Sequence, residues 1–94
     1  MGPADLVADW LVDRIAAVLA VDARTIPVDA PFAELGLSSL NAVELSDDLQ
    51  RWAGLVLSPT LAFDYPTIEA VAEHVAEEAE REGIVLTRAQ GALP

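Results

Sequence analysis

Apolar side chains recur at helical spacing in the first part of the chain. Between Ala4 and about Ala20, acidic residues alternate with an apolar series made of Val7, Leu11, Ile15 and Val18. Because positions three and four residues apart share one face of a helix, this stretch is predicted to form an amphipathic helix.

A second helix is predicted to begin just after Gly36 and Leu37 and to run to about Ala53. Ser38 can cap the free amides of its first turn, residues 40–53 contain neither Gly nor Pro, and Gly54 follows as a stop. A rotation of about 100° per residue divides this helix into two faces. The face expected to pack in the core holds Ala42, Leu45, Leu49, Trp52 and Ala53. The face expected to meet solvent holds Leu40, Val43, Glu44, Asp47 and Arg51.

The stretch between these two helices, residues 21–37, lacks a sustained period and contains Pro27 and Pro31. Proline removes a backbone donor, so an ordered loop is predicted here. Phe32 and Leu35 are expected to pin that loop to the core.

The last third of the sequence predicts one short helical turn and one longer helix. The turn is expected at residues 61–64, packed by Phe63 and Tyr65. Thr67 can cap the longer helix, which Gly83 ends. Its apolar stripe consists of Ile68, Val71, Ala72, Val75 and Ala79.

These elements predict an all-α fold in one domain, with a long first loop and a short third helix. We expect the domain to span residues 4–83. Residues 1–3 are expected to be added or linker residues, and residues 84–94 a flexible tail or linker remnant.

Charge and composition narrow the class of partner. The chain of 94 residues carries a formal net charge of −11, so nucleic acids and anionic membranes are not expected to bind it. Proteins with basic patches are the expected partners. No apolar run approaches the roughly 20 residues that cross a bilayer, and no signal-peptide pattern is present. We therefore expect a cytoplasmic protein.

The absence of cysteine excludes disulfides, thiolate metal sites and a protein thiol nucleophile. Any thiol chemistry must come from a group that is added to the chain. His74 is expected to be a surface histidine and not a metal ligand. No metal site is therefore predicted.

The most informative stretch, residues 35–45, has the sequence LGLSSLNAVEL. It places Ser39 in the first turn of the predicted second helix. Free backbone amides and the positive end of the helix dipole favour negative charge at that position. A phosphodiester on the Ser39 hydroxyl would therefore lie in a stabilising field.

This stretch resembles the pantetheine-attachment motif of polyketide-synthase acyl carrier domains. Residues 61–67, with the sequence LAFDYPT, resemble the segment that precedes the last helix in the same family. The two motifs occur in the family's order and separation, and the resemblance covers about residues 5–80.

The resemblance implies a four-helix carrier fold in which Ser39 receives 4'-phosphopantetheine from coenzyme A through a separate Mg-dependent phosphopantetheinyl transferase. The domain would hold acyl intermediates as thioesters and have no catalytic residues of its own. Its other partners would be ketosynthase, acyltransferase and further synthase domains. As an isolated domain it is expected to be a monomer.

One position departs from the family pattern, which usually has Asp directly before the modified serine. This chain has Ser38 there. Ser38 still supplies a helix cap, but we expect slower modification of Ser39 by some transferases. Ser38 itself is the rival attachment site, and Leu40 directly after the serine pair favours Ser39.

The exposed side of the second helix is the expected docking face. Leu40 and Val43 offer apolar contact beside the arm, and Glu44 and Asp47 can pair with Lys or Arg of a partner. An ordinary solvated helix face is the alternative interpretation.

Two other functions remain open from the sequence, and a third is set aside. A peptidyl carrier of nonribosomal synthesis shares the same chemistry, although such carriers more often show Gly-Gly before the motif. An unmodified helical docking or adaptor module would keep the bundle without the arm. A hydrolase built on Ser39, His74 and Asp64 lacks the Gly-x-Ser-x-Gly elbow after a strand.

Overall fold

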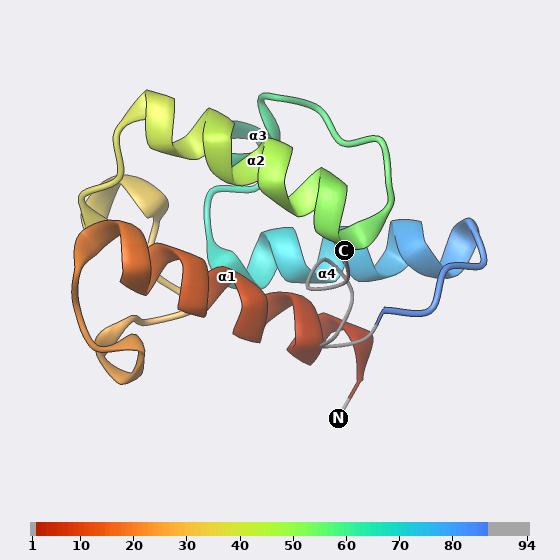
Figure 1. The fold of residues 1–94 in the computed structure, drawn as a ribbon, viewed down its shortest axis with the longest axis horizontal. Helices are drawn as coiled ribbons and strands as arrows, with labels where there is room; N and C mark the ends of the chain where they lie inside the picture. The colour runs from red at the N-terminus through yellow and green to blue at the C-terminus, as the bar shows by residue number, and fades with distance from the viewer. Residues whose placement is uncertain (1, 87–94) are drawn as a thin grey trace.

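The computed structural model describes residues 2–86 and contains four α-helices (Figure 1). They are α1 (Pro3–Leu19), α2 (Ser39–Ala53), α3 (Leu61–Asp64) and α4 (Ile68–Arg81). Two 3-10 turns, η1 (Ala23–Thr25) and η2 (Phe32–Leu35), lie in the loop after α1. The all-α prediction is confirmed. Within residues 2–86, no helix is long and apolar enough to cross a membrane.

The helices form a small bundle in which α1 packs chiefly against α4. In Figure 1, α2 lies above these two helices, and the short α3 lies behind α2. The loop after α1 fills the end of the bundle at which α2 begins. The start of α2 is therefore presented at one end of the molecule.

One apolar cluster forms the core, and it contains every core position predicted on α2 and α4. On α1 the stripe is wrong at its last member, because Val18 is 53% exposed and Ala16 is buried instead. Val7, Leu11 and Ile15 are four residues apart, so the buried stripe turns by about 40° at each step and passes Val18 on its way to the partly buried Leu19. Among the described residues, Ser46 is the one buried polar residue, and its Oγ donates to the Ala42 carbonyl (3.0 Å).

The loop after α1 is ordered and pinned to the core by Phe32 and Leu35, as predicted, and it also bonds to the start of α4. Phe32 is buried, and its N–H donates to the Pro66 carbonyl at 2.8 Å. The N–H of Glu69 donates to the Val28 carbonyl at 3.0 Å. These bonds tie the loop to α4 and so fix the point from which the chain enters α2.

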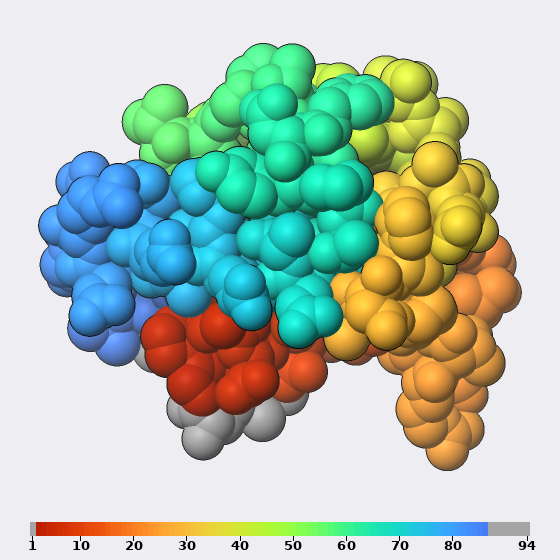
Figure 2. Space-filling model, turned by 180° about the vertical axis from the view of Figure 1, so that it is seen from behind, coloured from red at the N-terminus to blue at the C-terminus, as the bar shows by residue number. Residues whose placement is uncertain are grey.

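The corner of the loop around η1 projects from the bundle, seen in orange at the lower right of Figure 2. There the side chain and N–H of Arg24 both donate to the Asp22 carboxylate, at 2.8 Å for the shorter guanidinium contact. These donors hold the pKa of Asp22 below its ordinary value. The pair is exposed to solvent and orders this corner only locally.

The third helix buries only half of its side chains. Leu61 and Ala62 are buried, but Phe63 is 57% exposed, so the prediction that Phe63 packs this helix is wrong. Four residues in one turn point in four directions, and only the first two of these face the core. Tyr65 is half-buried and stacks on the ring of His74 with centroids 4.2 Å apart.

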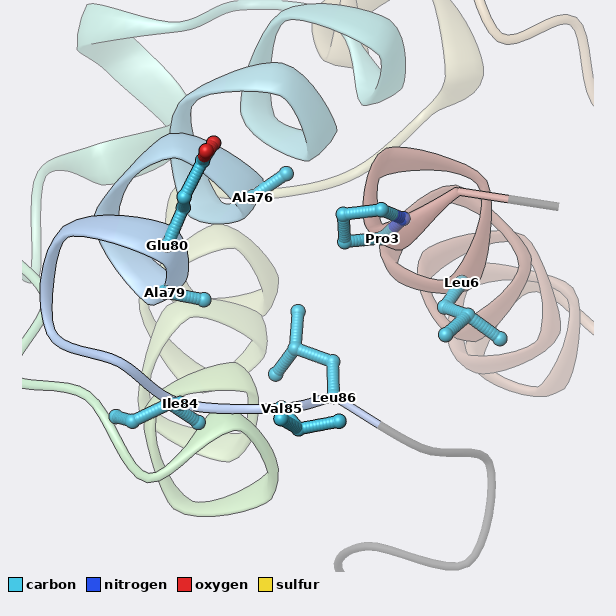
Figure 3. Close-up of a pocket in the computed structure, with 8 residues that line it drawn as sticks. All are labelled: Pro3, Leu6, Ala76, Ala79, Glu80, Ile84, Val85 and Leu86. Carbon is cyan, nitrogen blue, oxygen red and sulfur yellow. The ribbon is translucent and has the colours of Figure 1, made fainter.

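Residues 84–86, predicted to belong to a flexible tail, lie against the bundle. Leu86 is buried and Ile84 packs on the core cluster. Figure 3 shows Leu86 directed toward the space between α4 and the start of α1, in a cavity of about 490 Å³ that Pro3 and Ala79 also line. The apolar side chains of residues 84–86 pack on the bundle, although the position of this segment after the last helix predicted a flexible tail. The other tail residues, 87–94, lie outside the described residues.

Replacing Ala20 with Gly is expected to stabilise the domain. Ala20 ends α1 in the left-handed conformation (φ +56°), which disfavours a Cβ by about 1–2 kcal/mol. The greater freedom of Gly in the unfolded chain offsets part of this, so a net gain of roughly 0.5–1 kcal/mol is expected in urea unfolding. The control Ala17→Gly, inside α1 and also exposed, is expected to lose about 1 kcal/mol. Equal losses in both variants would contradict the argument.

Candidate functional site

The entrance to α2 is built by a turn at Gly36. Gly36 has φ +90°, a conformation that a residue with a Cβ rarely adopts, and it ends η2. After this turn Leu37 packs on the core cluster, while Ser38 and Ser39 are exposed. The glycine turn is thus followed first by an inward anchor, Leu37, and then by two outward hydroxyls.

The two serines have different roles in this turn. Ser38 is the N-cap of α2: its Oγ accepts from the Asn41 N–H (3.0 Å), and the Asn41 Oδ1 accepts from the Ser38 N–H (3.2 Å). This capping box engages Ser38 on both sides. Within residues 2–86, the Ser39 hydroxyl has no hydrogen-bond partner.

The backbone around Ser39 also favours an anion. Ser39 is the first residue of α2, and among the described residues no acceptor faces the N–H groups of Ser39 and Leu40. These unsatisfied donors lie at the positive end of the helix dipole. A negatively charged group attached to Ser39 would be stabilised by both effects.

The side of α2 next to Ser39 carries the predicted docking residues together. Leu40 is 66% and Val43 40% exposed, and Glu44 and Asp47 are exposed as well. We call these four side chains the α2 face. Two apolar side chains thus lie in solvent within about two helical turns of the Ser39 hydroxyl.

The two carboxylates of the α2 face, on Glu44 and Asp47, differ in their ion pairing. The guanidinium of Arg51 pairs with the Asp47 carboxylate and lies 3.9 Å from that of Asp48. Arg14 on α1 also pairs with Asp48, at 3.5 Å. Glu44 has no ion-pair partner in the described part of the chain. Arg51 was predicted to lie on this side but not to neutralise part of the Asp47 charge, although their i, i+4 spacing signals such a pair.

A groove runs beside the α2 face, between α2 and the loop that follows it. The Gln50 side-chain carbonyl accepts from the Leu57 N–H (2.8 Å), which holds the loop against the helix. The resulting groove has a volume of about 330 Å³. Its lining residues are Val43, Glu44, Ser46, Asp47, Gln50, Leu57 and Pro59. Nothing in the local sequence pattern predicts it, because its two walls come from separate segments.

Comparison with protein families gives a match over residues 9–75 to the family described as "Phosphopantetheine attachment site". Among curated proteins, the chain is 45% identical over 71 residues to polyketide synthase GfsA of Streptomyces halstedii, covering 74% of the chain and 1% of that protein. It is 48% identical over 66 residues to phenolphthiocerol synthesis polyketide synthase type I Pks15/1 of Mycobacterium bovis, covering 69% of the chain and 3% of that protein. The chain therefore spans only a small part of these relatives.

Solved structures of similar fold include two carrier proteins. One is an A1-type ACP domain from module 5 of MLSA1, with 41% identity, a TM-score of 0.70, and coverage of 80% of this chain and 76% of that one. The other is a free-standing peptidyl carrier protein from Acinetobacter baumannii, with 38% identity, a TM-score of 0.72, and coverage of 77% and 90%.

Proposed function

Because the chain belongs to the phosphopantetheine-attachment family of carrier domains, we propose that it holds the acyl intermediates of polyketide synthesis on an arm attached to Ser39. Carrier domains of this family are not themselves catalytic, and they carry 4'-phosphopantetheine covalently. The chain's own contribution is to present one hydroxyl and the surface around it.

The observation that carries this proposal is the contrast between the two serines. The Ser39 hydroxyl is exposed and unengaged within residues 2–86, whereas the Ser38 hydroxyl is occupied in the capping box. The free amides at the start of α2 suit the phosphodiester that links the arm. The residues present therefore fit the group, and Ser39 is its attachment point.

In the attachment step, the Ser39 Oγ forms a bond to the phosphorus of coenzyme A that bears pantetheine. The pyrophosphate P–O bond breaks, and 3′,5′-adenosine bisphosphate leaves with its electron pair. The hydroxyl proton passes to a base of the phosphopantetheinyl transferase. Once bound, the group supplies the thiol that this cysteine-free chain lacks.

Polyketide intermediates are favoured over aminoacyl groups by the curated relatives, which are polyketide synthases. The similarity to a peptidyl carrier protein makes a nonribosomal carrier the second candidate. The proposed partners are the transferase and the ketosynthase, acyltransferase and other domains of a synthase. We further propose that the protein is cytoplasmic and monomeric. The domain is proposed to extend to Leu86, and the burial of the Leu86 side chain supports this boundary.

The test of this function starts from the chain modified by a broad-specificity transferase with coenzyme A and Mg. The product is offered to the ketosynthase and acyltransferase domains of a polyketide synthase, and separately to an amino-acid-charged adenylation domain. Intact mass is expected to show a malonyl-type thioester and then a chain-elongated thioester on the carrier. Aminoacylation alone would establish the peptidyl carrier, and no phosphopantetheine gain at all would establish the unmodified adaptor.

The α2 face is proposed to dock these partners, because exposed apolar and acidic side chains lie together beside Ser39. Changing Glu44 and Asp47 to Lys is expected to slow acyl transfer from the acyltransferase to the modified chain by about tenfold, since partners with basic patches would be repelled. The matched control changes the exposed Glu73 and Glu77 of α4 to Lys. An unchanged transfer rate in the α2 double variant, or the same loss in both, would remove the docking role.

Ser38→Asp is expected to speed the modification of Ser39 several-fold. Asp caps helices as well as Ser does, so the start of α2 should persist, and the carboxylate restores the acid that the family usually has near the transferase's metal. The initial rate of mass gain, with Ser38→Asn as the uncharged capping control, measures the effect. No gain in rate for Ser38→Asp would mean that Ser38 is not what limits recognition.

A further inference from the structure

Two adjacent serines could each cap the start of α2. In the structure Ser38 is the N-cap, with the extended backbone (φ −79°, ψ 167°) that this position requires, and Ser39 is the first helical residue. The alternative is a helix that begins one residue later, with Ser39 as the cap and its hydroxyl turned toward the Ala42 N–H. That start would engage the hydroxyl that the proposed function leaves free, and it would release the Ser38 hydroxyl instead.

The residue three positions after each serine distinguishes these two starts. In a capping box, the third helical residue returns a side-chain acceptor to the N–H of the cap residue. With Ser38 as the cap that residue is Asn41, whose Oδ1 accepts from the Ser38 N–H at 3.2 Å. With Ser39 as the cap it would be Ala42, which has no side-chain acceptor and is buried in the core. The observed start closes the box, and the later start cannot.

We propose that Asn41 is the positioning residue that selects Ser39 as the attachment site, by holding Ser38 as the cap of α2. The inference rests on the proposed function and deepens it, because it names the residue that decides which serine receives the arm. Asn41 acts through Ser38 and needs no contact with coenzyme A.

Packing on either side of the serines does not make this choice. Leu37 packs on the core cluster before them and Ala42 belongs to that cluster after them. A later start would leave both contacts in place, because it unwinds only the first residue of the helix. Adding one residue to a helix end changes the free energy of the helix little. The hydrogen bonds of the capping box are therefore what separates the two starts.

The expected size of the selection follows from one hydrogen bond. A bond of ordinary strength shifts a two-state equilibrium about fivefold. If the two starts are otherwise equal, the Ser39 hydroxyl is free in about five of six molecules with the Asn41 acceptor and in about half without it. The helix propensity of residue 41 cancels, since this residue is helical in both starts.

The experiment compares Asn41→Ala with Asn41→Gln in the 94-residue chain. Alanine removes the acceptor, whereas glutamine, a usual residue at this position of capping boxes, keeps one. The matched control is Thr67→Ala, which removes the cap of α4, where the Thr67 Oγ accepts from the Ala70 N–H at 3.0 Å. This control destabilises the domain through a helix cap that lies outside the serine turn.

Two readouts are needed, one of modification and one of the helix start. The first is kcat/KM for phosphopantetheine transfer to Ser39 by a broad-specificity transferase, followed by mass spectrometry. The second is the set of backbone carbon chemical shifts of Ser39 before modification, measured by NMR, which report whether this residue is helical.

Asn41→Ala is expected to lower kcat/KM about twofold and to move the Ser39 carbon shifts away from helical values. Asn41→Gln should restore both readouts to those of the unchanged chain. Thr67→Ala should leave kcat/KM within about 1.2-fold and the Ser39 shifts unchanged, because its site is separate from the serine turn.

Three results would overturn the inference while leaving Ser39 as the attachment site. The first is an unchanged kcat/KM in Asn41→Ala. The second is the same loss in Asn41→Gln or Thr67→Ala, which marks a general loss of stability. The third is a loss in Asn41→Ala without a change in the Ser39 shifts. No mass gain even in the unchanged chain would instead overturn the proposed function together with the inference.

Discussion

Ser39→Ala is expected to abolish phosphopantetheine attachment under conditions that modify the unchanged chain to completion. The substitution removes the oxygen that forms the bond to phosphorus, so the loss should be complete and not partial. Alanine is tolerated at the first position of a helix, and the Ser39 side chain makes no hydrogen bond within residues 2–86. The fold should therefore survive, which circular dichroism and thermal unfolding can establish.

The matched control is Ser38→Ala, one residue earlier in the same turn. It removes the cap that accepts from the Asn41 N–H and should destabilise the domain by about 1 kcal/mol. Its Ser39 hydroxyl is intact, so the phosphopantetheine mass gain should persist. Loss of modification in Ser38→Ala together with its retention in Ser39→Ala would move the attachment point to Ser38.

Leu49→Ala is expected to have the largest effect on stability. Leu49 is 1% exposed and lies at the centre of the inner side of α2. The side chains around it, including Phe32 and Val71, leave an internal space of only about 10 Å³, so the site is closely packed. Removing three carbons there should cost about 3 kcal/mol and lower the melting temperature by roughly 15 °C.

The control for this effect makes the same change on the opposite side of the same helix. Leu40 is 66% exposed, so Leu40→Ala should alter the free energy of unfolding by less than about 0.5 kcal/mol. Both variants should be compared by urea unfolding at a temperature where the unchanged protein is folded. Equal losses for Leu40→Ala and Leu49→Ala would contradict the assignment of α2's two sides.

The parts of this fold that follow from local rules could be predicted from the sequence. The caps at Ser38 and Thr67 and the inner positions of α2 and α4 depend on neighbours within a few residues, and the structure confirms them. The predicted exposure of Glu44 and Asp47 is confirmed for the same reason.

The parts that depend on distant segments could not be predicted. The burial of Leu86 requires the surface that α1 and α4 make together. The groove requires the bond from the Leu57 N–H to Gln50, and no period in the sequence marks that pairing. The exposure of Val18 and Phe63 depends on where each helix lies against the core, which is a tertiary property.

The most direct test of the account is to locate the modified oxygen in the unchanged chain. After treatment with coenzyme A, Mg and transferase, cleavage after Arg24 and Arg51 releases the peptide 25–51, which contains Ser38, Ser39 and Ser46. Tandem mass spectrometry that breaks the backbone between these serines should place phosphopantetheine on Ser39. Its appearance on Ser38 or Ser46, or a peptide of unmodified mass after exhaustive treatment, would contradict the account.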